Sequence, residues 1–100
     1  MAIEDKTVLT EDVIRAEVAE LKGWAYLEET EELQRVWHFD KFVPTMAFVR
    51  RLTEIMDENN HHSDINLNSR NKTLTVTVTT HSENAVTRAD LDFAGAVNQG

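Results

Sequence analysis

The stretch Thr73-Leu74-Thr75-Val76-Thr77-Val78-Thr79 is the cleanest alternation of polar and apolar residues in the chain. Successive side chains of a β-strand point to opposite faces of a sheet. This run therefore predicts a strand with aliphatic residues facing a core and threonines facing outward. Residues 64–68 alternate in the same way, and the polar residues 69–72 separate the two runs. The two runs are predicted to pair as an antiparallel hairpin.

A second hairpin is predicted closer to the N-terminus. Residues 24–27 and 33–39 are rich in aromatic and β-branched side chains and flank a polar stretch, which favours two strands joined by a short loop. A helix over residues 11–22 is expected before them, because Thr10 can cap its first turn and Gly23 can adopt the left-handed conformation that ends it.

Two more helices follow from apolar spacing. One runs from Asp40 or Phe42 to Glu58, with Pro44 in its first turn. Its predicted apolar stripe consists of Phe42, Val49, Leu52 and Met56, widened by Phe48 and Ile55. The last helix begins at Thr87, and Asp90 completes a capping box with it.

The predicted order is therefore α-β-β-α-β-β-α. Hairpins interleaved with helices indicate an α+β fold, here a four-stranded antiparallel sheet with three helices packed on one face. A chain of 100 residues suits one domain, expected over residues 9–100, with a flexible N-terminal segment at residues 1–8.

Composition narrows the class of function. The net charge of −8 disfavours binding to nucleic acid through its phosphates. The chain has no cysteine, so it is compatible with a reducing compartment, and it shows neither a signal-peptide pattern nor a run long enough to span a membrane. A cytoplasmic protein with no membrane association is expected.

The strongest local signal is the histidine pair in Asn59-Asn60-His61-His62-Ser63-Asp64. His81 closes the second hairpin and Asp90 follows it, so these groups could meet where strands and a helix end. Histidine can donate or accept a proton near neutral pH, which favours an acid/base site. Two exposed loop histidines are the simpler alternative. A metal site is a third interpretation, but the histidine spacing does not support it, and His38 is expected on a strand surface.

Several motifs together are similar to a known family. They are Leu9-Thr10-Glu11, Gly23-Trp24, His38-Phe39-Asp40-x-Phe42, Phe48-Val49-x-Arg51, Asp57 ahead of His61-His62-Ser63, Thr80-His81, and Asp90. Over about residues 9 to 97 the chain resembles the pterin-4a-carbinolamine dehydratases, a family that includes the dimerisation cofactor of a homeodomain transcription factor.

The resemblance implies dehydration of a 4a-hydroxytetrahydropterin to the quinonoid dihydropterin, in tetrahydrobiopterin recycling. It implies a pterin substrate, no cofactor and no metal. The catalytic residues would be His61, His62 and His81, and the substrate-binding residues would be Asp57, Asn60, Thr79, Thr80, Ser82 and Asp90. The two aspartates would also support the histidines electrostatically.

A homodimer or homotetramer is also implied, because family members assemble through sheet edges and through helices. The Phe48/Ile55 flank of the second long helix and the edge of the strand at residues 73–79 are the candidate surfaces. Ser63 stands where the family usually has proline, and the hairpin lacks the aromatic residue expected after it. These departures keep open the alternative of a non-catalytic interaction module with the same fold.

Overall fold

The computed structural model describes residues 7–59 and 61–99 and has the predicted order of elements. The elements are α1 (Glu11–Val18), β1 (Trp24–Leu27), β2 (Glu32–His38), α2 (Phe42–Asn59), β3 (Asp64–Asn68), β4 (Thr73–Val78) and α3 (Arg88–Gln99). The α+β class is confirmed. Of the helices described, none has the length and hydropathy that a membrane span requires.

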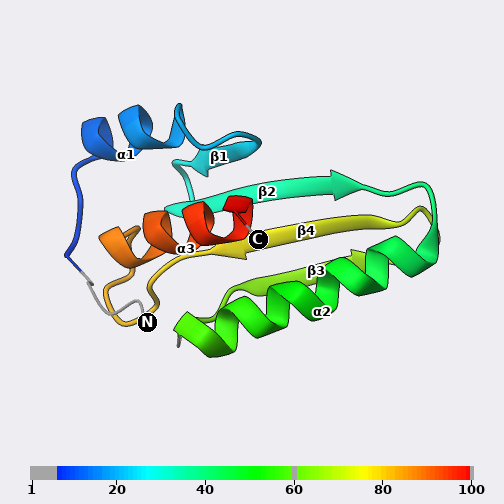
Figure 1. The fold of residues 1–100 in the computed structure, drawn as a ribbon. Coiled ribbons are helices and arrows are strands. Elements are labelled where there is room, and N and C mark those ends of the chain that lie inside the picture. The colour runs from blue at the N-terminus through cyan, green and yellow to red at the C-terminus, as the bar shows by residue number, and fades with distance from the viewer. Residues whose placement is uncertain (1–6, 60, 100) are drawn as a thin grey trace.

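The four strands form one antiparallel sheet in the order β1-β2-β4-β3. Strand β4 lies inside the sheet, because β3 pairs with one of its edges and β2 with the other. The expectation that residues 73–79 offer a free strand edge is therefore wrong. The edge strands are β1 and β3, since α2 carries the chain back so that the second hairpin docks beside β2 (Figure 1).

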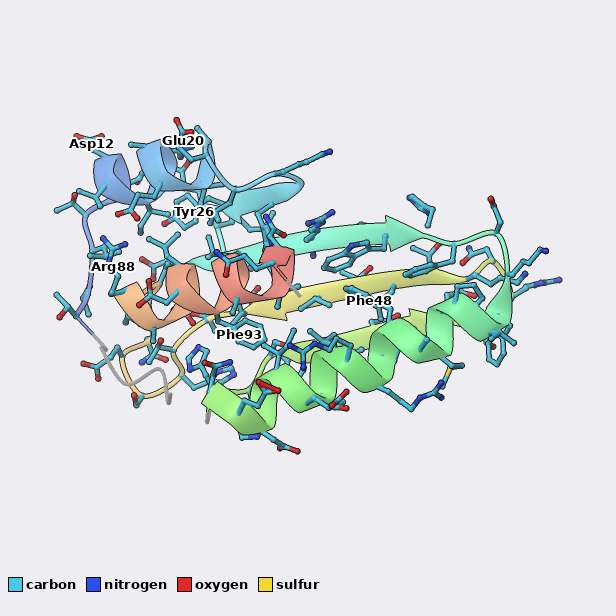
Figure 2. All side chains as sticks on the ribbon, viewed as in Figure 1. Asp12, Glu20, Tyr26, Phe48, Arg88 and Phe93 are labelled. Carbon is cyan, nitrogen blue, oxygen red and sulfur yellow. The ribbon has the colours of Figure 1, made fainter. Side chains whose placement is uncertain are left out.

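The helices cover one face of this sheet, as Figure 1 shows. Burial alternates along β4, where Leu74, Val76 and Val78 are buried and the intervening threonines are partly exposed. Phe48 of α2 and Phe93 of α3 contribute to the layer between helices and sheet (Figure 2). No helix in the described part of the chain lies over the threonine face, so the one-face arrangement is confirmed.

Helix α1 is shorter than the predicted helix at residues 11–22. Thr10 caps it, and its hydroxyl accepts a hydrogen bond from the backbone N–H of Val13 at 3.4 Å. After Val18 the backbone tightens, because the N–H of Leu21 donates to the carbonyl of Val18 three residues earlier. Gly23, at φ +85°, completes the change of direction into β1.

Helix α2 buries Leu52, Ile55 and Met56. Two expectations about it are wrong. Phe42 is 47% exposed, and Thr45 instead fills the buried position of the first turn. Ile55 is 3% exposed and belongs to the core, so it is not available for assembly.

The N-terminal segment lies beside the start of α3. The carbonyl of Thr7 accepts a hydrogen bond from the backbone N–H of Arg88 at 3.0 Å, and Val8 forms an isolated bridge with Thr87. Residues 1–6 lie outside the described part of the chain, and flexibility at residues 1–8 stays a prediction.

Candidate functional site

His61 is held at the junction between α2 and β3. Its backbone N–H donates to the carbonyl of Met56 at 3.2 Å, which ties the chain to the last turns of the helix. Its side chain is buried, and its ring lies 5.7 Å from that of Phe93, at 60° between the planes. His61 is therefore part of the packed interior and differs from an ordinary loop histidine.

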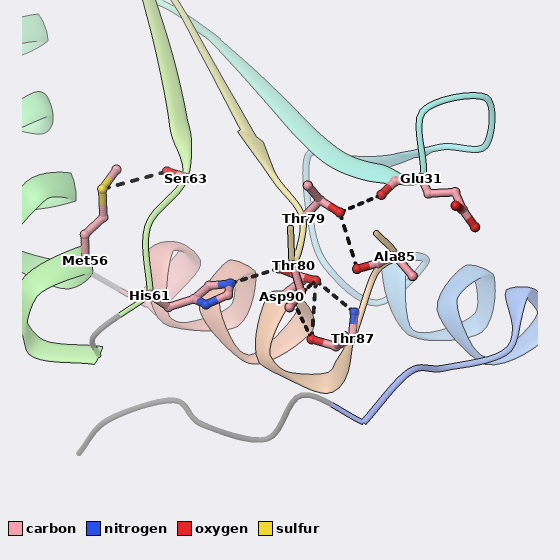
Figure 3. Close-up of polar contacts among 9 residues, drawn as sticks. All are labelled: Glu31, Met56, His61, Ser63, Thr79, Thr80, Ala85, Thr87 and Asp90. Carbon is pink, nitrogen blue, oxygen red and sulfur yellow. Dashed lines mark hydrogen bonds and ion pairs between the residues drawn. The ribbon is translucent and has the colours of Figure 1, made fainter. Parts of the chain in front are cut away.

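The His61 ring contacts a fully buried carboxylate. Nε2 of His61 lies 2.8 Å from Oδ1 of Asp90, a residue in the first turn of α3 with no exposed surface. Oδ2 of Asp90 accepts hydrogen bonds from the backbone N–H of Thr87 at 2.8 Å and from the hydroxyl of Thr80 at 2.9 Å (Figure 3). Asp90 therefore completes the predicted capping contact and also binds the histidine.

This geometry assigns the proton on the neutral ring. A carboxylate only accepts hydrogen bonds, so Nε2 of His61 must be the donor to Asp90. Nδ1 then carries the lone pair, and no residue in ranges 7–59 and 61–99 bonds to it. Nδ1 is the ring nitrogen that can exchange a proton with a ligand, while Asp90 keeps the ring oriented.

The other two predicted catalytic histidines are exposed. His62 follows His61 directly, and neighbouring side chains of an extended segment point to opposite sides. His81 lies in the turn after β4 and lines a cleft of about 470 Å³. Thr30, Glu31, Glu32, Thr79 and Asn84 line the same cleft. Among the described residues, no hydrogen bond or ring contact joins the three histidines, and their joint catalytic role stays a prediction.

The predicted substrate-binding residues have different environments. Asp57 is exposed on α2 and Ser82 is exposed in the turn after β4, whereas Asn60 lies outside the described residues. Thr79 donates its hydroxyl to the carbonyl of Glu31 at 2.9 Å and lies 3.3 Å from that of Ala85. Thr80 is 3% exposed, so its hydroxyl serves the buried network behind His61.

Two residues of this network were not identified as functional in the sequence. Thr87 was predicted only as a helix cap, but its hydroxyl also lies 2.7 Å from that of Thr80 and so belongs to the buried network. Phe93 follows Asp90 by three residues on the same helix, a spacing that places both side chains on one helix face and could have indicated its contact with His61. Over the described residues, no group of three or more histidine, aspartate or glutamate side chains could hold a metal ion.

Comparisons with known proteins agree with the fold and with the family resemblance. Residues 7–100 match the family model described as pterin 4 alpha carbinolamine dehydratase. A relative from Mycobacteroides abscessus is 37% identical over 91% of this chain and 93% of its own. One from Sulfolobus acidocaldarius is 33% identical over 91% and 96%. Both carry the provisional name pterin-4-alpha-carbinolamine dehydratase.

Solved structures extend the comparison. A transcriptional coactivator/pterin dehydratase from Brucella melitensis superposes with a TM-score of 0.84 at 27% identity, over 93% of this chain and 97% of that one. A pterin dehydratase-like RuBisCO assembly factor of the alpha-carboxysome has a TM-score of 0.64 at 20% identity, over 77% and 87%, which shows a common fold alone. The extent of the family match and the identity of these relatives place the chain in the pterin 4 alpha carbinolamine dehydratase family.

Proposed function

We propose that this protein dehydrates pterin-4a-carbinolamine to the quinonoid dihydropterin, as part of the recycling of a tetrahydrobiopterin-type cofactor. Family membership and the names of the relatives support the substrate class. The observation that carries the chemistry is the buried pair of His61 and Asp90, at 2.8 Å, with Nδ1 of the histidine unoccupied by any described residue. A histidine held in this way is suited to transferring a proton.

The reaction needs two proton transfers. The C4a–O bond breaks as the leaving hydroxyl gains a proton and departs as water, and a base removes a proton from a ring nitrogen of the pterin. We assign these steps to His61 and His81, with His62 binding or orienting the hydroxyl. Each positioned acid or base of this kind typically contributes about 10²–10⁴-fold to the rate.

Substrate binding is assigned to four polar residues. Asp57, Asn60, Thr79 and Ser82 are proposed to contact the pterin edge. A homodimer or homotetramer in the cytoplasm completes the proposal, and sedimentation analysis and cell fractionation test these two points.

The test is the dehydration rate of synthetic carbinolamine by purified protein. His61→Ala is expected to lower kcat by about 10²–10⁴-fold, and His81→Ala to lower it further in the double variant. His38→Ala is the matched control, because His38 lies on the open face of β2 and contacts the hydroxyl of Thr73 at 3.1 Å. A double variant that keeps the wild-type rate would refute the assignment.

A non-catalytic interaction module is the second candidate. The Brucella melitensis protein supports it, since that protein is described as a transcriptional coactivator as well as a pterin dehydratase. In this chain β3 is a sheet edge, and Ile65 on it is 36% exposed. An intact oligomer whose Tm does not rise with added pterin, and which has no dehydratase activity, would favour this candidate over the enzyme.

A further inference from the structure

Thr80 contributes a buried hydroxyl directly behind the His61–Asp90 pair. We propose that Thr80 is a positioning residue, which fixes the Asp90 carboxylate so that His61 keeps one orientation. This inference deepens the proposed function, because it concerns the same acid/base site. It also separates Thr80 from the residues proposed to contact the pterin.

The direction of each hydrogen bond follows from the available protons. Asp90 can only accept, so the Thr80 hydroxyl, at 2.9 Å, donates its single proton to Oδ2. The Thr87 hydroxyl lies 2.7 Å from the Thr80 oxygen and 3.4 Å from Oδ2 of Asp90, so the shorter contact favours donation of its proton to Thr80. The bonds form one directed chain, from Thr87 to Thr80 to Asp90 (Figure 3).

This chain leaves Asp90 one oxygen for the histidine. Oδ2 receives both the Thr80 hydroxyl and the backbone N–H of Thr87, at 2.9 and 2.8 Å, while Oδ1 faces Nε2 of His61. Rotation of the carboxylate would break both bonds to Oδ2. Water cannot replace them, because Asp90 and Thr87 have no exposed surface and Thr80 is only 3% exposed.

The backbone of Thr80 is itself held in place. Its N–H donates to the carbonyl of Ala85 at 3.2 Å, and the two residues form an isolated bridge that closes the turn after β4. The hydroxyl of the preceding residue, Thr79, donates to the carbonyl of Glu31. The end of β4 therefore presents the Thr80 hydroxyl to Asp90 from a rigid position.

The experiment compares Thr80→Val, Thr80→Ser and a matched control, Thr75→Val. Valine keeps the β-branched shape and removes the hydroxyl, whereas serine keeps the hydroxyl. Thr75 lies in β4 on the open face of the sheet, away from this network. If the valine variant does not fold, Thr80→Cys replaces it, since a thiol is only a weak donor.

The first measurement is solvent exchange of the His61 Nε2 proton by NMR, relative to the backbone amide of Val76 in the core. Thr80→Val is expected to accelerate exchange at His61 about tenfold, as for the loss of one hydrogen bond to a charged group, and to leave the Val76 amide unchanged. Thr80→Ser and Thr75→Val are expected to exchange as wild type does. Equal acceleration at His61 and Val76 would indicate a merely structural role and overturn the inference.

The second measurement is steady-state dehydration of the carbinolamine. Thr80→Val is expected to lower kcat about tenfold with KM nearly unchanged, and serine is expected to restore it. A wild-type kcat in an active Thr80→Val protein would overturn the inference. If the wild-type protein has no activity, the proposed function fails, and the exchange experiment still decides whether Thr80 positions His61.

Discussion

Replacing Asp90 with asparagine tests the role of the buried carboxylate most directly. The asparagine oxygen can still accept from the N–H of Thr87 and the hydroxyl of Thr80, which lie 2.8 and 2.9 Å from the native Oδ2. Its amide then faces Nε2 of His61 as a donor. The histidine can satisfy this amide only by moving its own proton to Nδ1, so the nitrogen proposed to act as base loses its lone pair.

The substitution should lower both the stability of the fold and kcat, and the hydrogen bonds to the carboxylate indicate by how much. Three donors contact the native carboxylate within 2.9 Å, and each charge-assisted bond becomes a neutral one. At about 1 kcal/mol per bond, the free energy of unfolding should fall by about 2–3 kcal/mol. For a domain of this size the Tm should then fall by about 10–20 °C. The wrong tautomer should lower kcat by about 10³-fold or more, by analogy with the serine-protease triad.

The assay combines carbinolamine dehydration at 25 °C with thermal unfolding by circular dichroism. Asp12→Asn is the matched control, because Asp12 is an exposed acid in the first turn of α1, as Asp90 is in the first turn of α3, and it should change the free energy of unfolding by less than about 1 kcal/mol. An Asp90→Asn protein that is folded and turns over at the wild-type rate would refute the proposed role of the carboxylate.

Two further predictions concern the scaffold. Glu17 and Arg88 form a bidentate ion pair at 2.5 Å, and the Arg88 hydrogen bond lowers the pKa of Glu17. The pair should therefore stabilise the fold above the ordinary pKa of glutamate and lose this effect as pH falls through the lower folded-state value. Because both side chains are partly exposed, Glu17→Gln should cost less than about 1 kcal/mol in urea unfolding at pH 7, and an equal cost at pH 2 would contradict the explanation. Gly23→Ala should destabilise by about 1–3 kcal/mol, because φ is +85° and the new methyl group would lie 2.6 Å from Nε of Arg35. Gly95→Ala in α3, where the methyl has room, is the control and should leave the Tm unchanged or raise it slightly.

Much of the fold could be predicted because its signals are local. The alternation of residues 73–79 defines a strand with one buried face, and the observed burial of Leu74, Val76 and Val78 follows it. Thr87 and Asp90 are three residues apart at a helix start, so their capping contact was also accessible from the sequence. Turns and caps depend on neighbouring residues, and such features are readable without the rest of the chain.

Packing between distant elements was harder to predict. Phe42 has the spacing of a buried residue, but it lies at the helix terminus and stays 47% exposed. Ile55 was considered a surface candidate, but the core includes it. Apolar spacing identifies the side of a helix that faces the core. Which residues on that side are buried depends on the elements that pack against it.

The sequence by itself determined the class of fold, the order of its elements and the presence of a histidine pair with a later aspartate. The tertiary structure alone decided that β4 is central, that His61 is buried while His62 is exposed, and that Asp90 binds His61 across 29 residues of sequence. Secondary structure follows from regular local spacing, but the distance between two side chains depends on how the sheet and helices pack. The candidate acid/base pair exists only because the end of α2, the end of β4 and the start of α3 meet in the fold.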